Sequence, residues 1–128
     1  MDNVLKIKKQ ELSQALRTLK EVLRKKNQNE IIRDAVIKRF EYTFESAWKT
    51  VKLFLRQAHG IDVFSPKDCW RELRKNTPFT DEETVLLLKM ADDRNEIIHT
   101  YREEFAEELY GKIKVDYYKL LEKIYKII

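Results

Sequence analysis

Long stretches of this chain contain no residue that ends a helix, and this constrains the fold more than any other feature. The 128 residues include two glycines and two prolines, so the turns that usually connect β-strands are scarce. Along these stretches apolar residues recur at three- and four-residue steps, the spacing of one face of an α-helix. With 43% hydrophobic residues, the chain can build a core. The sequence therefore predicts an all-α protein with a single helical-bundle domain over residues 1–128.

The first two predicted helices make up the N-terminal half. The first spans about residues 2–26, where leucines recur every seven residues on one stripe. Asn27-Gln28-Asn29 is the expected break. The second helix is expected over residues 30–59, and Gly60 is well placed just beyond its C-terminal end.

Start signals locate the remaining helices. Ser65-Pro66 supplies a capping hydroxyl followed by proline at the first helical position. Thr80 followed by Glu83 has the spacing of a capping box. Short joints make neighbouring helices antiparallel, so we expect a four-helix up-and-down bundle with one short additional helix. The last three helices are expected over about residues 66–76, 81–100 and 103–127.

Charge narrows the class of partner only slightly. There are 26 basic and 22 acidic residues, for a net charge of +4, which is mildly basic and unlike a polybasic nucleic-acid binder. One interpretation is a well-solvated bundle surface. The other is a modest preference for RNA, for a nucleotide or for an acidic protein partner, and charge alone does not choose between them.

The single cysteine and the hydropathy pattern indicate the compartment. Cys69 has no partner for an internal disulfide, as in a reducing cytoplasm, and we interpret it as a small apolar core residue. No signal peptide or apolar run of membrane-spanning length is visible. A cytoplasmic protein with no membrane association is expected.

No cofactor or metal is predicted. A phosphate-binding loop needs several glycines, and the chain has only Gly60 and Gly111. A zinc site near His99 lacks a second useful His or Cys.

The chemically richest stretch is Asp93-Arg94-Asn95-Glu96-Ile97-Ile98-His99-Thr100-Tyr101. On a helical wheel at about 100° per residue, Arg94 falls near the centre of an apolar sector. An unpaired buried charge is costly, so this arginine must meet a carboxylate or open onto a cavity. The sector consists of Leu87, Met90, Ala91, Ile97, Ile98 and Tyr101.

Asn95 and His99 lie four residues apart on one flank of that sector, so both can approach one groove together with Arg94. Arginine holds phosphate through a planar fork of donors. Histidine can give or take a proton near neutral pH, and asparagine can orient either group. Such a trio could grip a nucleotide, or cleave RNA by acid–base chemistry without metal.

A purely structural role is the alternative for the same residues. Arg94 could be salt-bridged to Glu41 or Glu45 on the second helix. A single histidine at the edge of an apolar stripe is usually structural. Asp93 could belong to a solvated face or a salt bridge, and Trp48 is first of all a bulky core anchor.

At these residues the sequence resembles a known family. Arg94 to Tyr101 is similar to the Arg-x4-His-x-Tyr signature of the HEPN superfamily. Two further stretches in the same order, residues 39–49 (Arg-Phe-Glu-Tyr-Thr-Phe-Glu-Ser-Ala-Trp-Lys) and 65–68 (Ser-Pro-Lys-Asp), resemble the nucleotidyltransferase substrate-binding protein family within it. The likeness covers nearly the whole chain.

This resemblance implies a fold, partners and a biological setting. Proteins of this kind are four-helix up-and-down bundles that associate with a minimal nucleotidyltransferase encoded beside them. They form homodimers, which bring two Arg–His motifs together at a shared cleft. Many such pairs are regarded as toxin–antitoxin modules.

The resemblance also implies roles for individual residues. In a metal-independent endoribonuclease toxin, His99 would be acid or base, Arg94 would hold the scissile phosphate and Asn95 would support them. Tyr101 matches the tyrosine to which the nucleotidyltransferase attaches AMP, which silences related toxins. Candidates for binding nucleotide or RNA, or for supporting the site, are Glu41, Glu45, Trp48 and Asp93.

Three hypotheses follow. The first is a substrate-binding and partner subunit, because the chain has no nucleotidyltransferase signature of its own, a Gly-Ser pair followed by spaced aspartates. The second is the endoribonuclease toxin. The third is a helical dimerisation module without a ligand, which predicts that Arg94 is fully paired with Glu41 or Glu45 and that no open cleft surrounds His99.

Overall fold

The computed structural model describes the backbone of residues 2–99 and 102–128, and the side chains of 3–98 and 102–128. These residues form helices joined by short connections, with no strand among them. The all-α prediction is therefore confirmed. The elements are α1 (Asp2–Leu23), α2 (Glu30–His59), α3 (Pro66–Asn76), α4 (Asp81–His99), α5 (Glu103–Lys112), η1 (Ile113–Tyr117) and α6 (Tyr118–Ile127).

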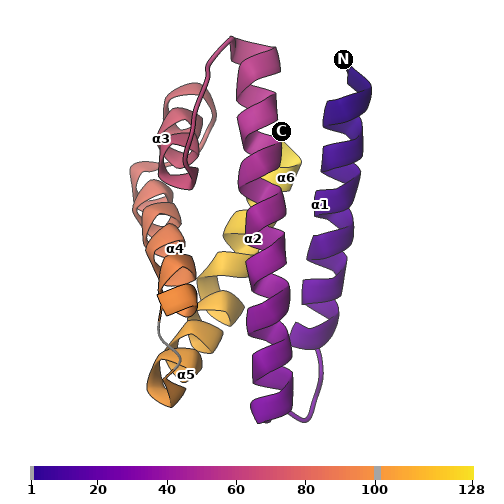
Figure 1. Cartoon of the computed structure of the whole chain (residues 1–128), viewed down its shortest axis with the longest axis vertical. Coiled ribbons are helices and arrows are strands. Elements are labelled where there is room, and N and C mark those ends of the chain that lie inside the picture. The colour runs from indigo at the N-terminus through magenta and orange to yellow at the C-terminus, as the bar shows by residue number, and fades with distance from the viewer. Residues whose placement is uncertain (1, 100–101) are drawn as a thin grey trace.

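Consecutive long segments run in alternating directions (Figure 1). Helices α1 and α2 lie side by side, α3 leads into α4 on the other flank of α2, and α5, η1 and α6 pass behind α2. The predicted last helix over residues 103–127 is thus a continuous helical segment, but it is not regular. Its middle, η1, is a π-helix, which separates α5 from α6.

Local capping explains why α2 and α3 begin and end where predicted. The Asn29 side chain accepts a hydrogen bond from the Ile32 N–H at 2.9 Å, and α2 ends at Gly60, which has φ of 65°. Glycine adopts this left-handed conformation without steric cost. The Ser65 hydroxyl accepts a hydrogen bond from the Asp68 N–H at 3.2 Å and caps α3.

The predicted capping box begins α4. The Glu83 N–H donates to the Thr80 hydroxyl at 3.1 Å, and the Thr80 N–H donates to the Glu83 carboxylate at 2.9 Å. That carboxylate also pairs with Lys123 of α6 at 2.7 Å. The Lys123 hydrogen bond, and then the hydrogen bond from the Thr80 N–H, lower the pKa of Glu83.

The first helix is shorter than predicted. It ends at Leu23 rather than at residue 26. Residues 24–29 are all exposed, so no apolar contact stabilises another turn, and helix ends without tertiary packing are marginal.

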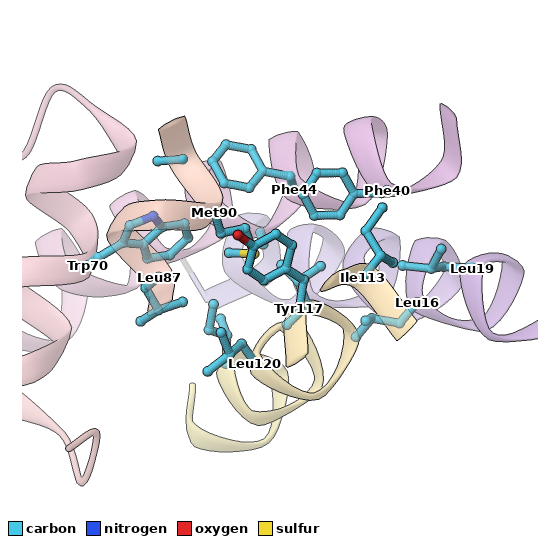
Figure 2. Packing of buried hydrophobic residues seen from close by; sticks show 14 of the residues in the cluster. Leu16, Leu19, Phe40, Phe44, Trp70, Leu87, Met90, Ile113, Tyr117 and Leu120 are labelled. Carbon is cyan, nitrogen blue, oxygen red and sulfur yellow. The ribbon is translucent and has the colours of Figure 1, made fainter. Parts of the chain in front are cut away.

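The core lies where the helical segments meet (Figure 2). The ring of Trp70 meets that of Phe44 edge-on, with centroids 5.8 Å apart, and Phe40 stacks on Tyr117 at 5.8 Å and 21°. Such aromatic pairs contribute beyond their buried area. The sequence-predicted stripes supply most of the other fully buried side chains, which include Leu12, Leu19, Leu55, Leu73, Leu87, Met90, Leu109, Ile113, Leu121 and Ile124.

Arg33 of α2 is a buried charge that the sequence analysis did not identify. Its side chain is 3% exposed and contacts Glu107 at 2.8 Å, Glu103 at 3.1 Å and Asp34 at 3.2 Å. These carboxylates, Glu103 first, raise its pKa further above an already high value. The cluster ties α2 to the first turns of α5.

Within the described ranges, no helix is long and apolar enough to cross a membrane.

Candidate functional site

Arg94 is held between α4 and α2. Its Nη2 donates to Glu45 Oε2 at 2.9 Å, and its Cζ lies 5.8 Å from the centre of the Phe44 ring. The Arg94 side chain keeps 25% of its surface exposed and that of Glu45 keeps 32%. Of the two salt-bridge partners predicted for Arg94, Glu41 and Glu45, the structure shows Glu45.

Glu45 does not saturate the Arg94 guanidinium. The Arg94 Nε is buried and has no hydrogen-bond partner among the described residues. A buried donor without a partner costs free energy and needs an explanation, such as a water or a ligand group. The full pairing expected of a ligand-free module is therefore absent from the described part of the chain.

A groove of about 760 Å³ adjoins this pair, between α1 and α2. Glu45 lines it, together with Tyr42 and Lys49 from the same helix. The second oxygen of Glu45, Oε1, pairs with Lys49 at 3.2 Å. One carboxylate thus contacts both the motif arginine and the wall of an open groove, which α1 completes with Ile7, Lys8, Gln10, Glu11, Gln14, Ala15 and Thr18.

Asp93, the neighbour of Arg94 in sequence, contacts α5 and η1 rather than α2. Its Oδ2 accepts hydrogen bonds from the Tyr117 hydroxyl at 2.5 Å and from Lys112 Nζ at 3.2 Å. Burial, and then this hydrogen bond to a carboxylate, raises the pKa of Tyr117. Asp93 therefore lies in a salt bridge, and the adjacent Asp92 pairs with Lys67 at 2.6 Å.

The other motif residues lie toward the end of α4. Asn95 is exposed. His99 is the last residue of α4. Its side chain and the whole of Tyr101 lie outside the described residues. The structure thus brings Arg94 and Asn95 to one end of α4 and leaves the roles of His99 and Tyr101 as predictions.

The helical wheel was wrong for Ile98. It was expected to be in the apolar sector, but its side chain is 62% exposed. Of the same sector, Leu87, Met90 and Ala91 are buried and Ile97 is partly buried. The reason is that no described residue of α4 beyond Ala91 is fully buried, so the core covers only the earlier turns.

Glu41 and Trp48 are both half-buried on α2. Glu41 has no ion pair within the described part of the chain, and the Trp48 ring packs against the core while its carbonyl accepts a contact from Cys69 Sγ at 3.6 Å. Each lies about one turn from Glu45, Glu41 before it and Trp48 after it.

Among the described residues, no three His, Cys, Asp or Glu side chains are close enough together to hold a metal ion. The motif itself supplies a guanidinium (Arg94), an amide (Asn95) and, five residues after the arginine, a histidine (His99). These groups suit recognition of a phosphate and acid–base chemistry next to it.

The sequence analysis did not identify the two donors that bond Asp93, Lys112 and Tyr117. The available signal was weak: Asp93 precedes the motif arginine and needs a donor when it is buried.

A family model and several solved structures match most of this chain. A family model described as "nucleotidyltransferase substrate binding protein like" matches residues 8–128. A solved protein from Thermus thermophilus is 40% identical, with a TM-score of 0.81 over 88% of this chain and 94% of that one. The comparison with curated proteins gave no match.

More distant solved structures share the fold. A tri-AMPylated HEPN toxin from Shewanella oneidensis, in complex with an MNT antitoxin, is 19% identical, with a TM-score of 0.77 over 98% of this chain and 96% of that one. A toxin–antitoxin structure with AMP-PNP is 17% identical, with a TM-score of 0.75 over 98% and 96%. Because the family model covers nearly the whole chain, this protein belongs to the nucleotidyltransferase substrate-binding protein-like family.

Proposed function

We propose that this chain is the helical substrate-binding and partner subunit of a two-protein minimal nucleotidyltransferase system, of the kind in which a HEPN toxin pairs with an MNT antitoxin. The observation that carries the proposal is the family match over residues 8–128. The fold similarity to a HEPN toxin solved with its MNT antitoxin extends over 98% of the chain and supports it.

The site supports a ligand-binding role for the subunit. The Nε–H of Arg94 is buried without a partner among the described residues, and Glu45, which pairs with Arg94, lines a groove of about 760 Å³. Guanidinium groups suit phosphate, so we propose nucleotide or RNA as the ligand, with Asn95, Asp93, Glu41 and Trp48 in support.

We also propose that the chain acts as a homodimer in the cytoplasm, as a four-helix up-and-down bundle to which α3 is added. Ile98, beside His99, exposes 62% of its surface. We propose that Ile98 contacts the second copy, which would bring two Arg94–His99 motifs together.

The test of the main proposal is co-purification. The tagged chain is coexpressed with the minimal nucleotidyltransferase encoded beside it and passed over affinity and size-exclusion columns. Co-elution in a fixed ratio is expected. Separate elution of two folded proteins would contradict the proposal.

The second candidate function is a metal-independent endoribonuclease. The incomplete pairing of Arg94 favours it, because a purely structural arginine would be expected to use its donors within the protein. In this proposal Arg94 holds the scissile phosphate, His99 is acid or base, Asn95 supports them, and AMP attached at Tyr101 silences the enzyme.

RNA cleavage in EDTA tests this candidate. Wild type should cleave, His99→Ala should lose cleavage, and His59→Ala is the matched control, since His59 packs on Phe54 at 5.5 Å, near the far end of α2. Absence of cleavage by folded wild type over varied RNAs would exclude the enzyme and leave the partner subunit.

A further inference from the structure

The last turns of α4, which carry the motif, have little apolar anchoring. Beyond Ala91 the described side chains are exposed or only partly buried. The position of Arg94 therefore depends on the few specific contacts that this part of α4 makes. Apart from the pairing of Arg94 with Glu45, these are the hydrogen bonds to Asp93 and the ion pair of Asp92 with Lys67.

The Asp93 carboxylate accepts hydrogen bonds from two donors that come from one segment of the chain. Its carboxylate is 15% exposed, and a single oxygen receives both the Tyr117 hydroxyl at 2.5 Å and the Lys112 ammonium at 3.2 Å. Hydrogen bonds to a charged group are about twice as strong as neutral ones. Both donors come from the π-helical segment or its first flanking residue.

The π-helix explains how two residues five apart reach the same atom. In a regular α-helix, positions five apart lie roughly 140° from each other around the axis. In a π-helix the hydrogen bonds run between residues five apart, which places such residues above one another. The Tyr118 N–H does bond to the Ile113 carbonyl in this way, so Lys112 and Tyr117 can share one face.

A second path of contacts leads from Tyr117 to Arg94 through α2. The Tyr117 ring stacks on Phe40 at 5.8 Å, Phe40 lies 6.1 Å from Phe44, and the Arg94 guanidinium lies 5.8 Å from Phe44. Figure 2 shows the Tyr117 ring facing Phe40 and Phe44, with its hydroxyl directed toward Met90 of α4. Together with the link from Arg94 to its neighbour Asp93, these contacts form a closed chain of which Arg94 is one member.

We infer that Tyr117 and Lys112, brought to one face by η1, are positioning residues that hold Arg94 in place by clamping Asp93. The clamp fixes the rotation of α4 about its axis at Asp93. Because Arg94 is the next residue, the same rotation aims its guanidinium at Glu45, whose side chain lines the adjoining groove. The inference rests on the proposed function only in taking Arg94 as the group that meets a phosphate.

The clamp also accounts for the irregular last helix. A π-helical turn is less favourable than an α-helical one and often marks a functional site. Here a regular helix would turn either Lys112 or Tyr117 away from Asp93. The buried carboxylate would then lose a donor, which is costly for a charged group.

The direct test observes the Arg94 side chain by NMR, without any assay of activity. The buried Arg94 Nε–H should give a resolved signal that exchanges slowly with water, identified by its loss in Arg94→Lys. In Tyr117→Phe, which keeps the ring and removes the hydroxyl, the exchange rate should rise by about tenfold, as expected for a lost hydrogen bond to a charged group. An unchanged signal in a folded Tyr117→Phe protein would overturn the inference.

Tyr118→Phe is the matched control. Tyr118 also donates its hydroxyl to a carboxylate, Glu122, at 3.3 Å, but on α6 and away from α4. The Tyr118→Phe substitution should leave the exchange rate of the Arg94 Nε–H unchanged. An equal effect of both substitutions would mean general loosening and would also overturn the inference.

Lys112→Met keeps the test decisive if Tyr117→Phe does not fold. It retains the apolar stem and removes the ammonium from a side chain that is 36% exposed. The Arg94 exchange rate should rise in the same direction, and no change would contradict the clamp. If RNA cleavage is absent from wild type but the NMR result holds, the enzyme proposal fails and the positioning role stands.

Discussion

Arg94 of α4 and Glu45 of α2 are joined by a hydrogen bond of 2.9 Å between partly exposed side chains. This pair explains how a charged residue occupies the position that the helical wheel places near the centre of an apolar sector. The guanidinium also lies against the face of Phe44 at 5.8 Å, which favours a cation. The pair therefore links the motif to the groove between α1 and α2.

Removal of the Glu45 side chain should destabilise the protein more than removal of Lys49, the second cation that Glu45 contacts. Glu45→Ala leaves Arg94 without its counter-charge, and we expect a loss of about 1–2 kcal/mol in the free energy of unfolding. Lys49→Ala, at a side chain that is 55% exposed, should cost about 0.5 kcal/mol or less. Urea denaturation of both variants checks this, and equal losses would contradict the anchoring role of Glu45.

Ile98→Asp should convert a homodimer to a monomer. The side chain exposes 62% of its surface next to the motif, and a buried charge at an interface is strongly unfavourable. Val85→Asp is the matched control, because Val85 is 63% exposed near the other end of α4. Light scattering during size exclusion gives the mass of each variant. A wild-type monomer, or a dimer that tolerates Ile98→Asp, would refute the dimer contact at Ile98.

The Glu83–Lys123 pair should make stability depend on pH in the acid range. The folded protein lowers the pKa of Glu83, so its stabilising effect is complete above the ordinary glutamate pKa of about 4.3. It is lost as the pH falls through the lower folded value. Urea denaturation should therefore show that wild type has a higher free energy of unfolding than Glu83→Gln at neutral pH. This difference should shrink below about pH 4.

Glu82→Gln is the control for this experiment, because Glu82 is exposed in the same turn of α4. It should show no comparable dependence on pH. A Glu83→Gln difference that stayed constant from neutral to acid pH would contradict the assigned role of the pair.

Cys69 should be inert in the folded protein. Its side chain is fully buried, and burial raises the pKa of the thiol to about 12. The thiolate is the reactive form, so iodoacetamide at pH 8 should not alkylate the native protein within the time that it needs to modify the chain in guanidinium chloride. Mass spectrometry gives both extents, and rapid native alkylation would show that the α3 region opens.

The helices could be predicted because their limits depend on local chemistry. Asn29, Ser65-Pro66, Gly60 and the Thr80–Glu83 box each act within a few residues, and the predicted limits of α2 and α3 agree with the structure. The first helix was predicted too long because its end depends on what the core covers, which a sequence pattern does not contain.

The site was predictable only in part, because its contacts join distant segments. The Arg94 partner was narrowed to Glu41 or Glu45 from the sequence, and packing selected Glu45. The π-helix and its two donors to Asp93 were missed, since the stripe of the last helix fits a regular α-helix equally well. Arg33 was missed because two of its acidic partners, Glu103 and Glu107, lie 70 and 74 residues further along the chain.

The central claim is that a minimal nucleotidyltransferase recognises this chain as its partner. Native mass spectrometry of the two purified proteins, mixed with and without magnesium ATP, tests it most directly. We predict a complex that contains both proteins and, with ATP, AMP adducts on the chain that are lost in Tyr101→Phe. Free, folded and unmodified proteins in both conditions would contradict the claim.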